Sequence, residues 1–341
     1  MYQQMKNILT TTAAVLMLTA MVACGSNGQD GRGQDDVADA DTTDSGSDVG
    51  RRDTLLIGLL PTLDCLPLYV AYDAGLTDSL SLPVAIVPFD NSFDCDDALF
   101  RGAIDLCVTD LVRGEWMRSR GADIVYLTST DTYWQMVTNR KARLKSVRQM
   151  TDKMVATTRH SALAMFVDNV LDSAKVDKEY VFSIQINSPL LRLKMIENNE
   201  MDAAVLAEPQ ATAARLAGHP VLADSRSRGR QLGVVAWRNT DSSTSGSHRS
   251  DVILRTTTGE VSAAALLTVY DTAVDLINNK GVAAYAGIIG RHMGADGRIV
   301  AELDSMETAC RAAGAAGLFS RSRVPLDKDI EAAGRYISDE K

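Results

Sequence analysis

Four aspartates stand where their side chains could meet a charged ligand. Asp64 and Asp110 each follow a short apolar run, while Asp94 and Asp96 lie where a helix begins. Together they predict an acidic cleft that binds an amine, an aminopyrimidine or another cation and disfavours a sulfonate or nitrate. Asp94 and Asp96 have a second interpretation, in which they cap a helix and complement its dipole. We favour ligand binding for Asp64 and Asp110 and leave both interpretations open for the other two.

Aromatic, acidic and hydroxyl side chains elsewhere extend this candidate site. Phe93, Tyr133 and Trp134 could stack on a planar ligand, although each alone is more often part of a core. Glu208 could accept a hydrogen bond from a ligand amine, or it could cap the next helix. Ser161 ends another polar loop and is a candidate N-cap for the helix that follows. We predict that these five residues contribute to ligand binding.

The cysteines suggest one disulfide. Cys65 and Cys95 follow successive apolar runs, which would place them on neighbouring loops at one end of a sheet. In an oxidising compartment we predict that they bond and stabilise those loops by ~3 kcal/mol. Cys107 lies in an apolar run and Cys310 in a helical segment, so we expect both to be buried free thiols.

Catalytic patterns are absent from the sequence. The four histidines are scattered, and no two have the spacing of metal ligands on one helix. There is no phosphate-binding loop with its lysine, no Gly-x-Ser-x-Gly turn and no Cys-x-x-Cys pair. We therefore predict neither an enzyme, nor a cofactor, nor a bound metal.

Apolar runs alternate with helical patterns along the first part of the body. Strands are expected at 55–60, 82–89, 104–108 and 123–127, with helices at 66–74 and 95–101, the second capped by Asp94. Short connections between alternating strands and helices predict a parallel sheet with crossover helices. Ligands bind beyond the carboxyl ends of such strands. The loops expected there are 62–67, 90–96, 109–112, 158–161 and 208–210.

The same arrangement returns further along the chain. Strands are expected at 154–157, 181–186 and 202–206, with helices at 162–174 and after Ser188-Pro189. Segments 99–108 and 195–205 both end a helix, turn through Gly or Asn and enter a strand at an Asp. This repetition predicts an α/β protein with two lobes, joined by hinges near 130–133 and Ala236.

The C-terminal third is predicted to be mainly helical. A strand at 231–236 would return the chain to the first lobe. Thr257 and Glu260 form a capping box for a long amphipathic helix that Gly281 ends. Asp327 is the expected cap of a last helix at 328–337.

The N-terminus resembles an export signal. Lys6 supplies a positive charge, residues 8–22 are apolar, and small residues precede Cys24. Met21-Val22-Ala23-Cys24 resembles the lipobox of bacterial lipoproteins, which implies lipidation of Cys24; an ordinary signal peptide with a chance cysteine is the alternative. Residues 25–50 are rich in Gly, Ser, Asn and Asp and predict a disordered tether.

Charge and length narrow the function further. The chain has 341 residues and a net charge of −9, without the basic stripe that nucleic-acid binding requires. We therefore expect no nucleic-acid partner, and membrane contact only through the lipid anchor. The residues beyond the tether are enough for two lobes of ordinary size.

The start of the body resembles a known family. Leu56-Ile57-Gly58-Leu59-Leu60-Pro61, followed by Asp64, Pro67 and Ala71, is similar to the opening of periplasmic solute-binding proteins of ABC transporters. The branch is the one that binds thiamine-pyrimidine precursors, alkyl sulfonates, taurine and nitrate. The resemblance continues through Gly102, Asp105 and Thr109-Asp110, and through Met195, Asp202 and Glu208-Pro209.

The resemblance implies a type II, two-lobed binding protein whose C-terminal helices return to lobe one. Its expected divisions are a signal peptide (1–23), an acidic tether (24–53), lobe one (54–132), lobe two (133–235) and the return to lobe one (236–341). It would be a monomer that captures a small nitrogen-containing or cationic solute and delivers it to an ABC permease and ATPase. The alternatives are an enzyme of the lyase or dehydratase type on the same fold, and a lipoprotein that senses or scavenges without a permease.

Overall fold

The computed structural model describes residues 54–239, 253–255, 260–312 and 318–339. The predicted signal peptide, the predicted lipidation site Cys24 and the predicted tether therefore lie outside the described residues, as does Thr257. None of the described helices is long and apolar enough to cross a membrane. The described residues also contain no group of three or more His, Cys, Asp or Glu placed to hold a metal ion.

Lobe one, as we use the term, is built on a five-stranded mixed sheet. Its central strand β3 pairs in parallel with β1, and β1 pairs in parallel with β2, while β10 runs antiparallel to both β3 and β4. In spatial order the strands are β2(Val84–Pro88), β1(Leu55–Leu59), β3(Leu106–Asp110), β10(Gly233–Arg238) and β4(Ile124–Ser129). Its crossover helices are α1(Leu66–Asp73), α2(Ser92–Phe100) and α3(Leu111–Arg118).

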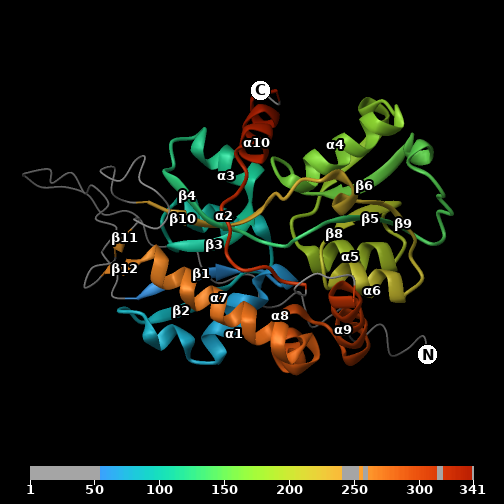
Figure 1. Ribbon diagram of the computed structural model, residues 1–341. Coiled ribbons are helices and arrows are strands. Elements are labelled where there is room, and N and C mark those ends of the chain that lie inside the picture. The colour runs from blue at the N-terminus through green and yellow to red at the C-terminus, as the bar shows by residue number, and fades with distance from the viewer. Residues whose placement is uncertain (1–53, 240–252, 256–259, 313–317, 340–341) are drawn as a thin grey trace, which may run out of the picture. The chain divides into compact units, whose positions relative to one another are not determined.

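Lobe two repeats this construction (Figure 1). Here β6 pairs in parallel with β7 and β8, and β5 runs antiparallel to β8 and β9. The spatial order is β7(Val181–Gln185), β6(Lys153–Thr157), β8(Ala203–Leu206), β5(Gln135–Thr138) and β9(Val221–Asp224). Its helices are α4(Ala162–Ala174), α5(Pro189–Glu197) and α6(Gln210–Leu216).

Short 3-10 segments complete the connections. They are η1(Leu63–Cys65), η2(Leu76–Ser79), η3(Val147–Met150), η4(Lys178–Tyr180), η5(Ser225–Arg228) and η8(Val282–Tyr285). A small antiparallel hairpin is formed by β11(Ile253–Arg255) and β12(Glu260–Ser262).

Two connections join the lobes before the C-terminal helices begin. The first runs from the end of β4 at Ser129 to the start of β5 at Gln135, which includes the expected 130–133. The second runs from Asp224 to Gly233. Ala236 lies inside β10, paired with Cys107 of β3, so the second connection ends before the position predicted for it.

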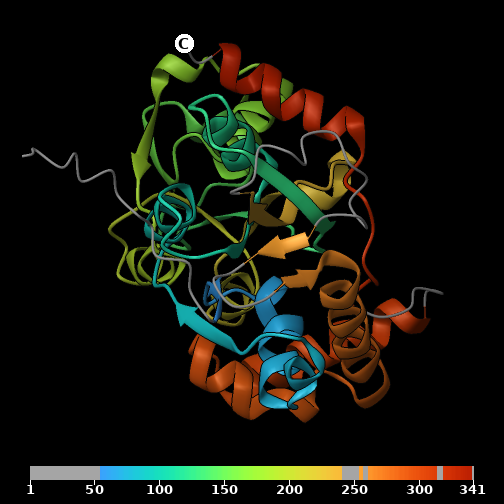
Figure 2. The same ribbon diagram turned by 90° about the vertical axis from the view of Figure 1, so that its left-hand side faces the viewer.

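The C-terminal helices pack mostly on lobe one. They are α7(Ala263–Lys280), α8(Ala286–Met293), α9(Gly297–Ala312) and α10(Asp327–Asp339). Helix α7 packs on α1, α10 packs on α3, and α9 also reaches α6 of lobe two. Figures 1 and 2 agree in showing the red helix α10 beside α3.

Local signals placed several helix ends correctly. Ser161 caps α4, Ser188 caps α5 with Pro189 in its first turn, and Gly281 ends α7, as predicted. The start predicted for α7 was wrong. Ser262 is its N-cap, because Glu260 is taken up by strand β12.

The fold buries two apolar clusters. The larger one covers both lobes and includes the central strands of each sheet. The smaller one lies between the lobe two sheet and helices α5 and α6, and includes Val137, Ile196 and Leu206. Both faces of the lobe two sheet are therefore covered, as expected for parallel strands with crossover helices.

The expected Cys65–Cys95 disulfide is not formed, and both residues are buried free thiols. The sulfur of Cys65 accepts a hydrogen bond from Leu60 N at 3.4 Å within its own turn. Cys95 instead lies on the inner face of α2 and points toward the thiol of Cys107. The expected free thiols Cys107 and Cys310 are free, with Cys107 buried and Cys310 half-buried.

Candidate functional site

A pocket with several polar side chains among apolar ones lies where strand ends and helix starts of both lobes meet. Lobe one contributes the loop after β1, with Thr62 and Asp64, and the end of β3, with Asp110. Lobe two contributes the segment that begins α5, with Asn187 and Arg192. The position matches the rule that open α/β sheets bind ligands beyond the carboxyl ends of their strands.

Asp64 is a half-buried carboxyl of this pocket with one buried oxygen that has no partner. Its Oδ1 has no hydrogen-bond partner, and burial raises its pKa above the ordinary value. The hydroxyls of Thr62, Thr132 and Thr130 lie around it and offset only part of that effect. An unpaired buried carboxyl is costly, so its retention favours a role in binding.

Asp110 joins the two lobes through a single oxygen. Its Oδ1 accepts hydrogen bonds from Arg113 N of α3 and from Ala162 N of α4, both at 2.9 Å. The same carboxyl therefore caps one helix from each lobe. Burial raises the pKa of Asp110 to about 7, because desolvation outweighs these two bonds.

Arg192 lies on the opposite side of the pocket. It is 4% exposed, although no carboxylate of the described chain pairs with it. Its NH1 donates to the carbonyl oxygen of Ile186 at 2.7 Å and to Thr158 Oγ1 at 3.1 Å, while its Nε has no partner. Desolvation lowers the pKa of Arg192 to about 10, so it remains a cation at neutral pH.

Two of the four aspartates predicted to form the acidic cleft have other partners. Asp96 is buried and binds Arg113 Nε at 2.7 Å. Asp94 is exposed, and the helix cap predicted for it is provided by Asn91, whose side chain accepts from Asp94 N. Neither residue is among those that line the pocket.

The aromatic candidates likewise differ in whether they line the pocket. Trp134 is buried and lines the pocket. Phe93 is 41% exposed and lies 5.7 Å from the Arg113 guanidinium, away from the pocket lining. Ser161 is buried and is the N-cap of α4. The backbone N–H of the next residue, Ala162, donates to Asp110.

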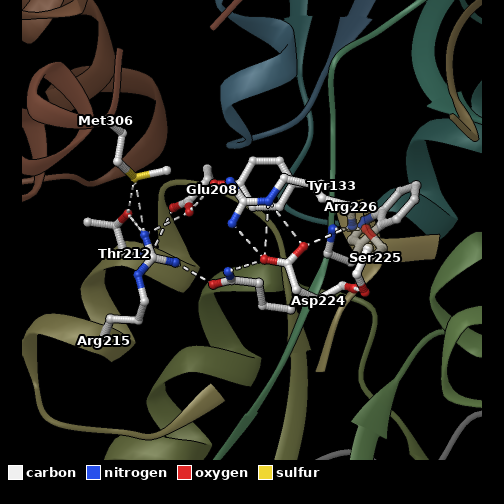
Figure 3. A network of polar contacts seen from close by, with 11 residues as sticks. Tyr133, Glu208, Thr212, Arg215, Asp224, Ser225, Arg226 and Met306 are labelled. Carbon is white, nitrogen blue, oxygen red and sulfur yellow. Dashed lines mark hydrogen bonds and ion pairs between the residues drawn. The ribbon is translucent and has the colours of Figure 1, made fainter. Parts of the chain in front are cut away.

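Tyr133 and Glu208 belong to a polar network on the other side of Asp64 (Figure 3). Tyr133 OH donates to Glu208 Oε1 at 2.7 Å, and Arg215 NH2 donates to the same oxygen at 3.0 Å. Glu208 Oε2 accepts from Thr212 N at 2.9 Å, which fits the helix-capping alternative. Figure 3 shows the Arg226 guanidinium stacked on the Tyr133 ring, and the distance to the ring centroid is 4.0 Å.

A second cavity adjoins that network. It shares Asp64 and Thr132 with the first pocket, and Asp131, Tyr133 and Glu208 also line it. An apolar part of its wall comes from α9 and the segment after it, including Met306 and Phe319. Asp64 is thus the acidic residue common to both cavities.

Direct hydrogen bonds hold the lobes together around these cavities. Leu63 N donates to the carbonyl oxygen of Glu208 at 2.8 Å, and Gln210 Nε2 donates to that of Pro61 at 2.7 Å. The rings of Trp116 and His160 also stack across the lobes with centroids 6.0 Å apart. These contacts, together with the bond from Ala162 to Asp110, join the two lobes.

Sequence reasoning missed Arg192. The segment after β7, with Asn187, was not counted among the ligand-facing loops, although it too follows the carboxyl end of a parallel strand. The available signal was the Ser188-Pro189 helix start, which places residue 192 in the first turn of a helix that faces this edge. An arginine in that turn was therefore a candidate for the site.

The chain matches no family model, and no curated protein sequence matches it. Solved structures do match. The alkanesulfonate-binding protein SsuA from Xanthomonas axonopodis pv. citri, solved with MOPS, has a TM-score of 0.65 at 16% identity, covering 85% of this chain and 93% of its own. The aliphatic sulphonate-binding protein SsuA from Escherichia coli has a TM-score of 0.63 at 16% identity, covering 85% and 91%.

A third similar structure is the periplasmic nitrate-binding protein NrtA from Synechocystis PCC 6803. Its TM-score is 0.59 at 15% identity, with 72% of this chain and 68% of that chain covered. All three are binding proteins by description, and all share the pair of mixed sheets flanked by helices. The chain therefore has the two-lobed α/β fold of ABC-type substrate-binding proteins, as its sequence predicted.

Proposed function

We propose that this protein captures one small solute in the pocket between its lobes and delivers it to an ABC permease. The observation that carries the proposal is the pair of buried, unsatisfied groups in that pocket, Asp64 Oδ1 and Arg192 Nε. Structures rarely leave such groups without partners unless a ligand, ion or water completes them. The similarity to sulfonate- and nitrate-binding proteins supports the same role.

The site residues proposed for the solute are those that line the pocket. Asp64 and the free face of Asp110 would accept hydrogen bonds from a nitrogen-containing group, such as the amine of a pyrimidine precursor, and Trp134 would pack against it. Asp94 and Phe93 are left outside this set because neither lines the pocket. Tyr133 and Glu208 hold the neighbouring wall in place through their hydrogen bond to each other.

The cellular setting remains part of the proposal. Lipidation at Cys24 and the tether to residue 53 would hold the two lobes outside the cytoplasm, close to a membrane permease. In this setting lobe one would comprise residues 54–132 and the returning residues 236–341, and lobe two would comprise residues 133–235. The protein would act as a monomer, because a hinged receptor of this kind encloses its ligand within one chain.

The test is to identify what the full-length protein carries. Protein purified under native conditions is denatured, and the released small molecules are identified by mass spectrometry. The proposal expects one solute in near-equal amount to the protein, recovered unchanged after incubation with fresh apoprotein. A solute that is converted to another compound would favour an enzyme, and a protein that never retains a solute would contradict the proposal.

A further inference from the structure

Arg192 is a buried cation that the described chain does not neutralise. Its guanidinium bonds only to carbonyl oxygens and to the Thr158 hydroxyl, and its Nε has no partner. A guanidinium withdrawn from water is costly unless an anion compensates it. The residue nevertheless lines the pocket, where a bound molecule could reach it.

The nearby acids are poorly suited to be its counterion. Asp96 is already paired with Arg113, and Asp110 is held by the amides of α3 and α4. Asp64 is half-buried with an enclosed Oδ1, Asp110 is buried, and desolvation raises the pKa of both carboxyls. The pocket thus contains the Arg192 cation and two carboxyls whose pKa values are raised.

The N-terminus of α4 is not free to take an anion. Its first amide, Ala162 N, is bonded to Asp110 at 2.9 Å. Arg192, in the first turn of α5, is the remaining cationic group that lines the pocket. Its planar guanidinium can donate two parallel hydrogen bonds to two oxygens of a carboxylate, sulfonate or phosphonate.

We propose that Arg192 binds an anionic group of the solute, which is therefore dipolar, with an acidic end at Arg192 and an N–H donor at Asp64. This inference rests on the proposed solute-binding function and names the chemical class of its ligand. It adds an acidic end to the nitrogen-containing or cationic solute expected from the four aspartates, two of which lie outside the pocket lining.

A direct test records the NMR signals of the arginine Nε–H groups in the full mature chain after its solute has been removed. The Arg192 signal is assigned by its loss in Arg192→Gln. Three probes of matched length are then titrated: β-alanine carries both charged ends, propionate only the acid and propylamine only the amine. We expect the acid-bearing probes to shift the Arg192 signal, with β-alanine binding at least ~10-fold more tightly than propionate.

Variants test whether binding of the probes depends on the charge of Arg192 itself or only on the overall charge of the protein. Arg192→Gln should weaken β-alanine binding at least ~10-fold, and Arg192→Lys should recover part of it because it keeps the charge without the fork. Arg159→Gln removes the same charge from an exposed residue that does not line the pocket, and should change binding less than ~2-fold. Failure of both acid-bearing probes to shift the signal, an equal response to propylamine, or unchanged binding by Arg192→Gln would overturn the inference.

Failure here differs from failure of the proposed function. If the solute that co-purifies has no acidic group, Arg192 is a structural residue of the α5 turn and the binding function stands. If no solute co-purifies and no fraction of a small-molecule extract raises the melting temperature, the binding function itself fails.

Discussion

The carboxyl of Asp110 in lobe one accepts a hydrogen bond from the backbone N–H of Ala162 in lobe two, at 2.9 Å. The same oxygen accepts from Arg113 N, so one side chain caps helices in both lobes. The contact between the lobes at the pocket and the stability of the fold therefore both depend on the Asp110 carboxyl, which can titrate.

This relationship predicts an unusual pH dependence. Burial raises the pKa of Asp110 from 3.8 to about 7, so between these values the native protein holds a proton that the unfolded chain has lost. The contribution of Asp110 to stability therefore falls as pH rises from about 4 through 7. Asn at this position can still accept both amide bonds and does not titrate.

Asp110→Asn should accordingly gain stability relative to the wild type as pH rises. The gain between pH 5 and pH 8 should be roughly 2–3 kcal/mol, measured by urea unfolding at both values. Asp110→Ala, which loses both caps, should be about 1–2 kcal/mol less stable than Asp110→Asn at each pH, because neither side chain titrates. A stability difference between Asp110→Asn and wild type that does not vary with pH would contradict the assignment.

A second prediction concerns the packing beneath the site. A Cβ on Gly58 of β1 would overlap Ile104 and approach Cys95 Sγ to 2.9 Å. Gly58→Ala should therefore cost about 1–3 kcal/mol in the free energy of unfolding, measured by denaturant titration. Gly297→Ala is the control, since nothing lies within 4 Å of the added carbon, and it should be neutral or stabilising. Equal effects of the two changes would disprove the close approach at Gly58.

The Tyr133–Glu208 bond predicts energetic coupling. In a double-mutant cycle with Tyr133→Phe and Glu208→Gln, the coupling free energy should be about 1 kcal/mol, because the hydrogen bond is 2.7 Å long and partly buried. Tyr285→Phe in place of Tyr133→Phe serves as the control, because the Tyr285 hydroxyl has no partner. Its combination with Glu208→Gln should be additive, and coupling of similar size in both cycles would refute the specific contact.

The free thiols yield a fourth prediction. Burial raises the pKa of the Cys65 and Cys95 thiols well above the ordinary value, and both side chains are inaccessible. Both should resist alkylation in the native protein and react fully in denaturant without a reductant. Peptide mapping by mass spectrometry distinguishes this from a disulfide, which would leave the two residues unreactive until reduced.

Much of the fold could be predicted because its signals are local. Helix α4 has the bounds and the Ser161 cap expected from its sequence, and the apolar runs of β1 and β6 lie within about one residue of the predicted strands. Strands β5 and β9 were missed; both are four residues long and antiparallel to their neighbours, outside the alternation of strands and helices that indicated the parallel strands. Their pairing with each other depends on a chain segment more than eighty residues away.

The candidate site was harder to predict than the fold. Asp64 and Asp110 line the pocket because one lies in the loop after β1 and the other ends β3, and the strand ends settle the end of the sheet where they lie. The direction of a side chain within a helix start is not settled locally. Asp96 turned inward to Arg113, Asp94 turned outward, and Arg192 reaches the pocket from the first turn of α5, which was not counted among the ligand-facing segments.

The most direct test of the account compares Asp64 with Asp94, two aspartates from the same predicted rim. Asp64 lines the pocket with an unsatisfied oxygen, whereas Asp94 is exposed and bonded to Asn91. Isothermal titration with the solute recovered from wild-type protein would be performed on Asp64→Ala and Asp94→Ala, both checked for folding. We predict a loss of affinity of about 10- to 100-fold for Asp64→Ala and less than ~2-fold for Asp94→Ala. Equal affinities for the two variants would contradict the placement of the solute in this pocket.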